Sequence, residues 1–229
     1  MTRAPGEAAD GGPQQGRLLD AAAARAWVRA LADAVEQACD QLTALDQAIG
    51  DGDHGTNLRR GMRAVTETLD GFDAPTPGAV LKKAGMTLIS SVGGASGPLY
   101  GSALRSMGKA LDVPDSPGAD AGQLAAGISA GLEAVQRLGA AQVGDKTMVD
   151  AWAPAAAAFA ADAWRGTAEA SAAAARAAEQ AARDTIPLQA RKGRASYLGA
   201  RSVGHQDPGA TSTALLFRAL ADVLGTSPE

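Results

Sequence analysis

Apolar side chains recur at steps of three and four through most of the chain, which is the spacing of one face of an α-helix. The first such stretch runs from about Arg17 to Leu45 and places these residues on one face: Trp27, Leu31, Val35, Ala38, Leu42 and Leu45. A later stretch has the same spacing at Leu124, Ile128, Leu132, Val135 and Leu138. Because no stretch alternates apolar and polar residues with β-branched enrichment, the pattern predicts helices and no sheet.

Segments rich in glycine and proline divide this pattern into about eight predicted helices. We expect them over about residues 17–45, 55–69, 77–91, 96–111, 124–138, 146 onward, 168–185 and 210–224. Pro154 is expected either to kink the sixth helix or to start a new one, and a short helix near 187–191 is a further option. Residues 1–16 are predicted to form a flexible tail, and residues 17–229 a single all-α domain.

Composition supports this prediction and excludes several classes of function. The apolar fraction is 46%, much of it alanine, and aromatic residues make up only 3%, which favours closely packed helices. The net charge is −4 with scattered Lys and Arg, so no nucleic-acid or membrane partner is expected. Cys39 is the single cysteine, which excludes an intrachain disulfide and a thiolate zinc site. No secretory signal or membrane span is recognisable, so we expect a cytoplasmic protein.

The most informative segment is an acidic loop that contains Asp46, Asp51 and Asp53 within eight residues, with no Lys or Arg between them. Clustered carboxylates repel one another unless a cation compensates their charge. Gly50 and Gly52 allow the backbone to bend so that the three carboxylates can converge. All-oxygen ligands suit a hard ion such as Mg²⁺ or Ca²⁺.

A turn that only caps the next helix is the alternative interpretation of this loop, because Asp-Gly pairs are common in turns. Against it, Asp46 lies at the carboxyl end of the first helix, where the helix dipole disfavours a carboxylate. An EF-hand is excluded because the twelfth positions, counted from Asp46 and Asp51, are Asn57 and Met62 instead of Glu.

Three further glycine-rich junctions precede predicted helices and suit an anionic ligand. The first is the segment from His54 to Asn57, whose free N–H groups would attract an anion, although His54 could be a surface residue and Thr56 and Asn57 caps. The second, residues 93–98, allows close backbone approach to a ligand or forms a tight turn. It lacks the Gly-x-Ser-x-Gly spacing of a nucleophile elbow.

The third junction, residues 189–209, has three basic residues in four followed by a polar glycine-rich stretch, which suits phosphate contact or a solvated loop. The segment from Gly139 to Thr147 is no Walker A motif, because Asp145 separates Gly144 from Lys146 and no strand precedes it; Asp145 could instead cap a helix. The residues alone therefore indicate a nucleotide or phosphate ligand with a hard metal.

In these segments the sequence resembles the L subunit of bacterial dihydroxyacetone kinase, the DhaL family of nucleotide-binding subunits. The matching blocks are residues 45–57, 85–101, 144–148 and 189–212, which occur in the family's order and together span nearly all of the chain from about Arg17. The last block is long and specific, because it runs from Gln189 through Arg191-Lys192-Gly193-Arg194 to Ser212.

The resemblance implies a barrel of eight antiparallel helices with ADP at one mouth. Two Mg²⁺ ions would be held by Asp46, Asp51 and Asp53 and would bind the ADP phosphates. It also implies that the phosphate end of the site is formed by His54, Gly55, Thr56, Asn57, Ala95 and Ser96. The adenine side would be formed by Gly139 and Met148. The segment that closes the site would contain Arg191, Asp207, Pro208 and Gly209. Which of Arg191, Lys192 and Arg194 contacts the nucleotide stays open. No side chain of this chain is expected to act as a nucleophile or an acid–base catalyst.

Members of this family fall into two groups. In one, linked to the phosphoenolpyruvate phosphotransferase system of glycerol metabolism, bound ADP is phosphorylated in place by a phosphohistidine carrier, the M-type subunit. The ATP so formed passes its γ-phosphoryl group to dihydroxyacetone on a K subunit. In the other, ATP exchanges freely, and the acceptor is dihydroxyacetone, a related ketose or, in related modules, a fatty acid. We expect the first group; the alternatives are an ATP-dependent L subunit and a non-catalytic metal-binding scaffold.

Overall fold

The computed structural model describes residues 17–225, and in that range it contains eight α-helices and two 3₁₀-helices. The α-helices are α1 (Ala21–Ile49), α2 (His54–Asp70), α3 (Pro77–Ser91), α4 (Ser96–Ala110), α5 (Ala121–Gly139), α6 (Met148–Asp162), α7 (Thr167–Asp184) and α8 (Pro208–Gly225). The 3₁₀-helices are η1 (Ala163–Arg165) and η2 (Arg194–Ser202). The all-α prediction is confirmed, whereas the predicted tail, residues 1–16, lies outside the described residues.

Several predicted boundaries differ from the structure. The first helix begins at Ala21, because Asp20 caps it by accepting the backbone N–H of Ala23, and it continues to Ile49 instead of ending at Leu45. The sixth begins at Met148 with Thr147 as its cap, so the expectation that Asp145 caps it is wrong. That helix runs through Pro154 without ending. The short helix expected near 187–191 is also wrong, since the helical turn lies at residues 194–202.

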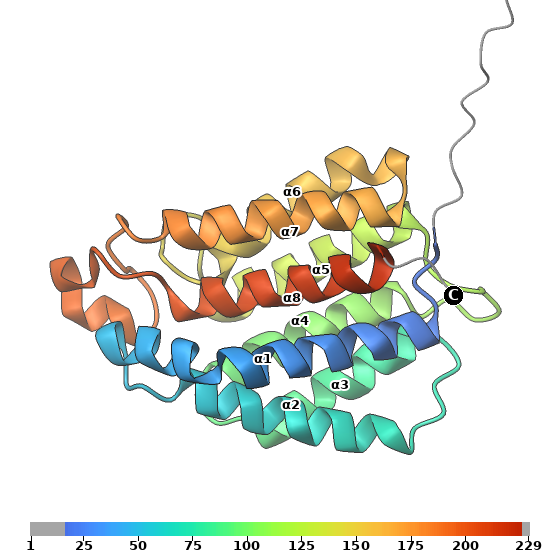
Figure 1. Ribbon diagram of the computed structural model, residues 1–229, viewed down its shortest axis with the longest axis horizontal. Helices are drawn as coiled ribbons and strands as arrows, with labels where there is room; N and C mark the ends of the chain where they lie inside the picture. The colour runs from blue at the N-terminus through green and yellow to red at the C-terminus, as the bar shows by residue number, and fades with distance from the viewer. Residues whose placement is uncertain (1–16, 226–229) are drawn as a thin grey trace, which may run out of the picture.

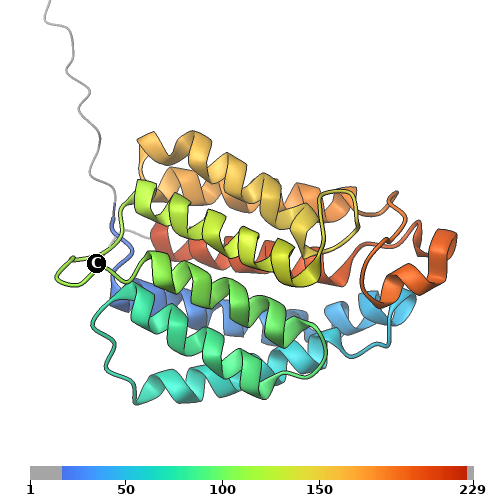
Figure 2. The same cartoon turned by 180° about the vertical axis from the view of Figure 1, so that it is seen from behind.

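The helices form a closed ring in which each packs against the next along the chain and α8 packs against α1 (Figures 1 and 2). Consecutive helices run in opposite directions, so the junctions before α2, α4, α6 and α8 all lie at one end of the ring. The acidic loop and the glycine-rich junctions singled out in the sequence are therefore brought together by the topology alone.

The pair α3 and α4 approaches unusually closely because glycines face each other across it. A Cβ atom on Gly85 would lie 2.5 Å from the carbonyl oxygen of Gly101, and one on Gly78 would lie 2.3 Å from that of Gly108. Small residues serve the same purpose between α6, α7 and α8, where buried alanines such as Ala155, Ala170 and Ala174 fill the contacts. These contacts explain how a chain with so few aromatic residues forms a dense core.

Four large aromatic side chains are fully buried in the core of the ring: Trp27, Trp152, Phe159 and Phe217. Trp152 and Phe217 pack edge to face, with ring centroids 5.5 Å apart. The indole N–H of Trp27 donates to the carbonyl of Leu216 and that of Trp152 to the carbonyl of Ile128, so neither buried N–H is left without an acceptor. Leu138, expected on the buried face of its helix, is instead 54% exposed at the ring's end.

Among the helices of residues 17–225, none is both long enough and apolar enough to cross a lipid bilayer. The cytoplasmic location stays a prediction from composition.

Candidate nucleotide and metal site

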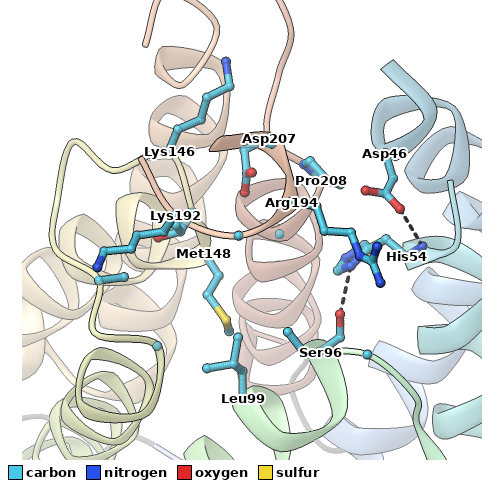
Figure 3. A pocket seen from close by; sticks show the side chains of 18 of the residues that line it. Asp46, His54, Ser96, Leu99, Lys146, Met148, Lys192, Arg194, Asp207 and Pro208 are labelled. Atoms are coloured by element: carbon cyan, nitrogen blue, oxygen red, sulfur yellow. Dashed lines mark hydrogen bonds between the residues drawn. The ribbon is translucent and has the colours of Figure 1, made fainter. Parts of the chain in front are cut away.

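A pocket of about 320 Å³ opens at the end of the ring where the glycine-rich junctions meet. Its walls come from the acidic loop and the starts of α2, α4, α6 and α8, together with residues 192–195 (Figure 3). This volume is in the range of cavities that hold a small organic ligand. The pocket therefore unites segments that are up to about 160 residues apart in the chain.

The three carboxylates of Asp46, Asp51 and Asp53 converge at one side of this pocket. One oxygen from each lies within 4.8 Å of the others. Oδ2 of Asp46 accepts the backbone N–H groups of Asp53 and His54, at 2.8 and 3.0 Å, which fixes the loop around that side chain. These two bonds leave Oδ1 of Asp46 for a cation, so the donor set fits a hard ion such as Mg²⁺.

Glycine at two positions of this loop is required by its geometry. A Cβ atom on Gly50 would lie 2.1 Å from Oδ1 of Asp46, and Gly52 has a φ of +75°. Any larger residue at position 50 would displace the Asp46 carboxylate, and one at position 52 would strain the backbone. The acidic loop is therefore built around the position of one carboxylate.

His54 joins three helices next to the acidic loop. Its Nδ1 lies 3.0 Å from Oγ of Ser96 on α4, and its Nε2 lies 2.9 Å from Oγ of Ser212 on α8 (Figure 3). The hydroxyl of Tyr100 continues this network to Ser212 and Thr213. Burial lowers the pKa of His54, although Asp46 and Asp53 raise it, and a neutral imidazole has one donor and one acceptor nitrogen for its two serine partners.

The helices α2 and α4 begin at the pocket with N-cap residues whose own side chains make no capping bond; in α2 the N–H of His54 is bonded to Asp46 instead. Neither Asp53 nor Ala95 makes a capping bond, whereas Asp20, Thr76 and Asp120 cap α1, α3 and α5, three of the four helices that begin at the opposite end. Uncapped first turns present backbone N–H groups and a partial positive charge. Beside a cation site, these two helix starts suit a phosphate group.

Asp207 lies buried at the start of α8, where it is a pocket residue and a helix cap. Its Oδ2 accepts the backbone N–H of Ala210 at 2.7 Å. Burial raises the pKa of Asp207 to about 7; the Ala210 bond and Lys146 oppose the rise, whereas Asp150 and Asp46 add to it. The pKa of this carboxyl group thus lies near neutral pH, well above that of an exposed aspartate.

The side of the pocket opposite the carboxylates is apolar. Leu99, Val135, Ala141 and Met148 line it, and Figure 3 shows the tips of Leu99 and Met148 facing each other. Gly139 completes this wall without a side chain. An apolar slot across from an anion site is the arrangement that a flat aromatic ring bearing phosphates would occupy.

The basic segment provides two pocket residues, Lys192 and Arg194. Nε of Arg194 lies 3.0 Å from Oδ2 of Asp51. Arg191 is exposed and does not line the pocket; its backbone N–H donates to the carbonyl of Asp145 instead. Of the three basic residues in this segment, Lys192 and Arg194 therefore line the pocket and Arg191 does not.

The predicted site residues fall into two sets. Those that line the pocket are Asp46, Asp51, Asp53, His54, Ala95, Ser96, Gly139, Met148, Asp207, Pro208 and Gly209. Four others do not line it: Gly55, Thr56, Asn57 and Arg191. Gly55 instead lets α2 approach α1, since a Cβ there would lie 2.2 Å from the carbonyl oxygen of Cys39. Asn57 accepts a bond from Arg60, and Thr56 donates to the carbonyl of Asp53.

Sequence reasoning missed the apolar pocket residues Leu99, Val135 and Ala141, and it assigned no role to Lys146. The first three look like ordinary helix-face residues, and only the ring arrangement turns them toward a cavity. Lys192 and Arg194 were left undecided and could have been found from their place beside Gly193, whose φ of +66° marks a sharp turn.

Comparison with known proteins identifies the family. The model of the DAK2 domain matches residues 48–222, which is well over half of the chain. The chain belongs to the DAK2 domain family. The matched range contains the acidic loop from Ile49 onward, the starts of α2 and α4, and the segment between α7 and α8.

Two relatives resemble the chain over most of its length and most of their own. The chain is 44% identical over 194 residues to PEP-dependent dihydroxyacetone kinase 1, ADP-binding subunit DhaL, of Listeria innocua, covering 85% of this chain and 92% of that protein. It is 43% identical over 202 residues to the corresponding subunit of the Escherichia coli enzyme, covering 85% and 93% respectively. The resemblance to the DhaL family is therefore confirmed.

The fold recurs in a solved structure. The dihydroxyacetone kinase of C. freundii, in complex with AMP-PNP and Mg²⁺, superimposes with a TM-score of 0.67 at 24% identity. This chain is covered to 97%, but it spans only 37% of the length of that kinase chain. The likeness confirms the all-α helical fold.

Proposed function

We propose that this chain is the ADP-binding subunit of a phosphoenolpyruvate-dependent dihydroxyacetone kinase. ADP would stay bound, accept a phosphoryl group from a phosphohistidine carrier subunit, and pass it to dihydroxyacetone held on a K subunit. The observation that carries the proposal is the convergence of Asp46, Asp51 and Asp53 beside the starts of α2 and α4 in one pocket. The names of the Listeria and Escherichia relatives support the same assignment.

Magnesium fits the residues present. The three carboxylates offer two oxygens each, of which one, Oδ2 of Asp46, is already engaged by backbone N–H groups. We propose that Asp46, Asp51 and Asp53 together hold two Mg²⁺ ions, the number that the family resemblance implies. Bound Mg²⁺ would neutralise phosphate charge and align the oxygens that exchange the phosphoryl group.

The chain's own residues would then position the nucleotide. The start of α4 at Ala95 and Ser96 would receive the phosphate end, and His54 lies within hydrogen-bonding distance of the Ser96 hydroxyl beside it. The apolar wall formed by Leu99 and Met148 would receive the adenine ring on the other side. Phosphoryl transfer depends mainly on such positioning and on charge compensation, so no nucleophilic side chain is needed here.

Partner chains follow from the same proposal. The pocket has room for one small ligand, and the carboxylates and the apolar residues that line it are those assigned to the nucleotide. We therefore propose that the phosphoryl acceptor is bound by a separate K subunit and that the donor is an M-type phosphohistidine carrier. Both would approach the same end of the ring, where the phosphate side of the pocket opens.

Nucleotide content is the direct test of this function. Protein purified without added nucleotide is denatured in acid, and the supernatant is analysed for ADP and ATP. We expect ADP in near-equimolar amount, and Asp51→Asn protein should release little. Absence of nucleotide together with absence of Mg²⁺-dependent ADP binding would contradict the proposal.

A second measurement separates the alternatives. Phosphoryl transfer to dihydroxyacetone is followed with a K subunit, supplied either with free ATP or with a phosphohistidine carrier. Activity only with the carrier supports the proposal, and equal activity with free ATP alone indicates the exchanging group. No transfer under either condition, with metal binding intact, indicates a non-catalytic metal-binding module.

A further inference from the structure

The ammonium group of Lys146 is enclosed by backbone carbonyl oxygens in the interior of the protein. The side chain is only 1% exposed, although lysine is among the residues least often buried. Five carbonyls lie within hydrogen-bonding distance of Nζ: those of Thr185 (2.9 Å), Ile186 (3.4 Å), Leu188 (3.0 Å), Ser202 (2.8 Å) and His205 (2.5 Å). Lys146, to which sequence reasoning assigned no role, therefore bonds to backbone inside the protein instead of facing solvent.

The five oxygens belong to the two ends of the segment that connects α7 to α8. Residues 185–188 follow α7 directly, and residues 202–205 lead into α8. Between them the chain leaves the ring, forms η2, and contributes residues 192–195 to the pocket wall. One ammonium group therefore joins the two ends of the segment 186–205 to each other and to the loop before α6.

The conformation of Lys146 directs its side chain to this place. Its φ is +61°, and although Lys146 borders the pocket, Figure 3 shows its ammonium end extending away from Met148. Asp150 fixes the loop on either side by accepting the N–H groups of Gly144 and Thr147, at 2.6 and 2.7 Å. A non-glycine residue rarely adopts a positive φ, so the strain accepted here points to a required side-chain position.

Charge is needed at the centre of these carbonyls. Five carbonyl dipoles that point toward one site repel one another unless a cation or several donors lie between them. An ammonium group supplies three N–H donors and a full positive charge. Burial lowers the pKa of Lys146, whereas Asp207 and Asp150 raise it and so favour the charged form.

We propose that Lys146 is a positioning residue for the nucleotide, because its ammonium group holds the two ends of segment 186–205 together and thereby fixes the pocket wall that contains Lys192 and Arg194. Lys146 does not touch the ligand through its ammonium group. The effect on nucleotide affinity rests on the proposed function, whereas the effect on the segment does not.

Hydrogen exchange of the ligand-free full-length protein, followed residue by residue, tests the first part. Lys146→Met keeps a long unbranched side chain and removes the charge, and Lys109→Met on the exposed side of α4 is the matched control. The informative amides are those bonded within or to the segment: Ala190, Arg191, Gly204 and Asp207. In Lys146→Met we expect their exchange to be at least tenfold faster, with the amides in the middle of α3 and α4 unchanged.

Nucleotide affinity, measured by titration calorimetry with ADP and excess Mg²⁺, tests the second part. Lys146→Met should bind at least tenfold more weakly than the wild type, and Lys109→Met should bind within twofold of it. Unchanged affinity and unchanged exchange in Lys146→Met would overturn the proposal. So would a uniform rise in exchange over all helices, because it would assign Lys146 to the stability of the whole ring.

A chemical rescue covers the case in which Lys146→Met does not fold. Lys146→Ala is refolded with n-propylammonium, which replaces the missing carbons and the ammonium group, or with tetramethylammonium, which has no N–H donor. Protection of the four amides should return only with n-propylammonium; equal behaviour in both salts would overturn the proposal. If wild-type protein failed to bind ADP, the proposed function would fall, and the exchange comparison would still decide what Lys146 holds.

Discussion

Nε of Arg194 lies 3.0 Å from Oδ2 of Asp51, and this contact joins the start of η2 to the acidic loop across the mouth of the pocket. Both side chains are partly solvent-exposed, so the ion pair is worth at most about 1 kcal/mol. Its interest lies in its position, because Asp51 is one of the three carboxylates expected to hold metal. A guanidinium and a divalent cation would draw on the same carboxylate.

Replacement of Arg194 by Gln should therefore strengthen metal binding when no nucleotide is present. Loss of a competing pair worth up to about 1 kcal/mol corresponds to an affinity up to about fivefold higher. Mn²⁺ titration followed by electron paramagnetic resonance measures this, with Arg201→Gln, exposed on the same 3₁₀-helix, as control. Unchanged Mn²⁺ affinity in Arg194→Gln would show that the Arg194–Asp51 pair does not compete with the ion.

Asp46→Asn should abolish metal-dependent nucleotide binding and leave the fold intact. The amide oxygen can still accept the N–H groups of Asp53 and His54, so only the anionic ligand is lost. Mutation of residues that hydrogen-bond to a metal ligand lowers metal affinity by about 10- to 100-fold, so loss of the ligand itself should lower it by more than about 100-fold. Calorimetry with ADP and Mg²⁺ measures the loss, and Asp40→Asn, exposed on the same helix, should bind like the wild type.

Asp207 should make the protein less stable as the pH rises from about 4 to 7. The folded protein retains the proton up to a pKa of about 7, whereas the unfolded chain loses it near 3.8. Unfolding therefore releases a proton in this window, so stability is greatest below it and falls by up to about 1.4 kcal/mol per pH unit within it. Thermal melts in EDTA should show a flatter pH profile for Asp207→Asn, whose amide can still cap α8.

The control for that experiment is Asp222→Asn on the exposed side of the same helix. Its pH profile should follow that of the wild type. If Asp207→Asn also keeps the wild-type profile, the carboxyl group of Asp207 does not titrate near neutrality in the folded protein.

Gly85→Ala should destabilise the ring through the contact between α3 and α4. The added methyl group would lie 2.5 Å from the carbonyl oxygen of Gly101, which is backbone and cannot rotate away. Overpacking of this kind costs about 1–3 kcal/mol. Gly122→Ala, at the exposed start of α5, meets nothing closer than 3.4 Å and should be neutral or stabilising by up to about 1 kcal/mol. Urea titrations of both variants decide the matter; equal midpoints would contradict the close approach.

The predictions that succeeded depend on local pattern. The step of three and four at Trp27, Leu31 and Val35 gave the first helix, and all three side chains are buried. The spacing of Asp46, Asp51 and Asp53 with intervening glycines led to the expectation that they converge, which the structure confirms; their use as metal ligands stays a prediction.

The predictions that failed depend on contacts distant in sequence. Residues 187–191 look helical because nothing local shows that the carbonyls of Ile186 and Leu188 turn toward Lys146. Lys146 itself looks like a surface lysine or a phosphate ligand, since its burial arises from two segments about 40 and 60 residues further along the chain. Arg191 matches the family pattern as well as Arg194 does, but Arg194 lines the pocket and Arg191 does not, because its backbone N–H is bonded to the carbonyl of Asp145.

The glycine pairs between α3 and α4 bear on how the protein can move during a reaction cycle. Gly78 opposes Gly108 and Gly85 opposes Gly101, so each helix has contact points two turns apart that fit the other in one register only. Sliding of α3 along α4 would drive side chains into backbone at both points. Opening and closing around a nucleotide is therefore expected to leave these two helices, and the 93–95 turn that joins them, as the stationary side of the pocket. The displacement would fall to the opposite side, where residues 189–201 are held by Lys146 at their two ends and, between those ends, by the Arg194–Asp51 ion pair and the small apolar cluster of Ile49, Ala190 and Ala195.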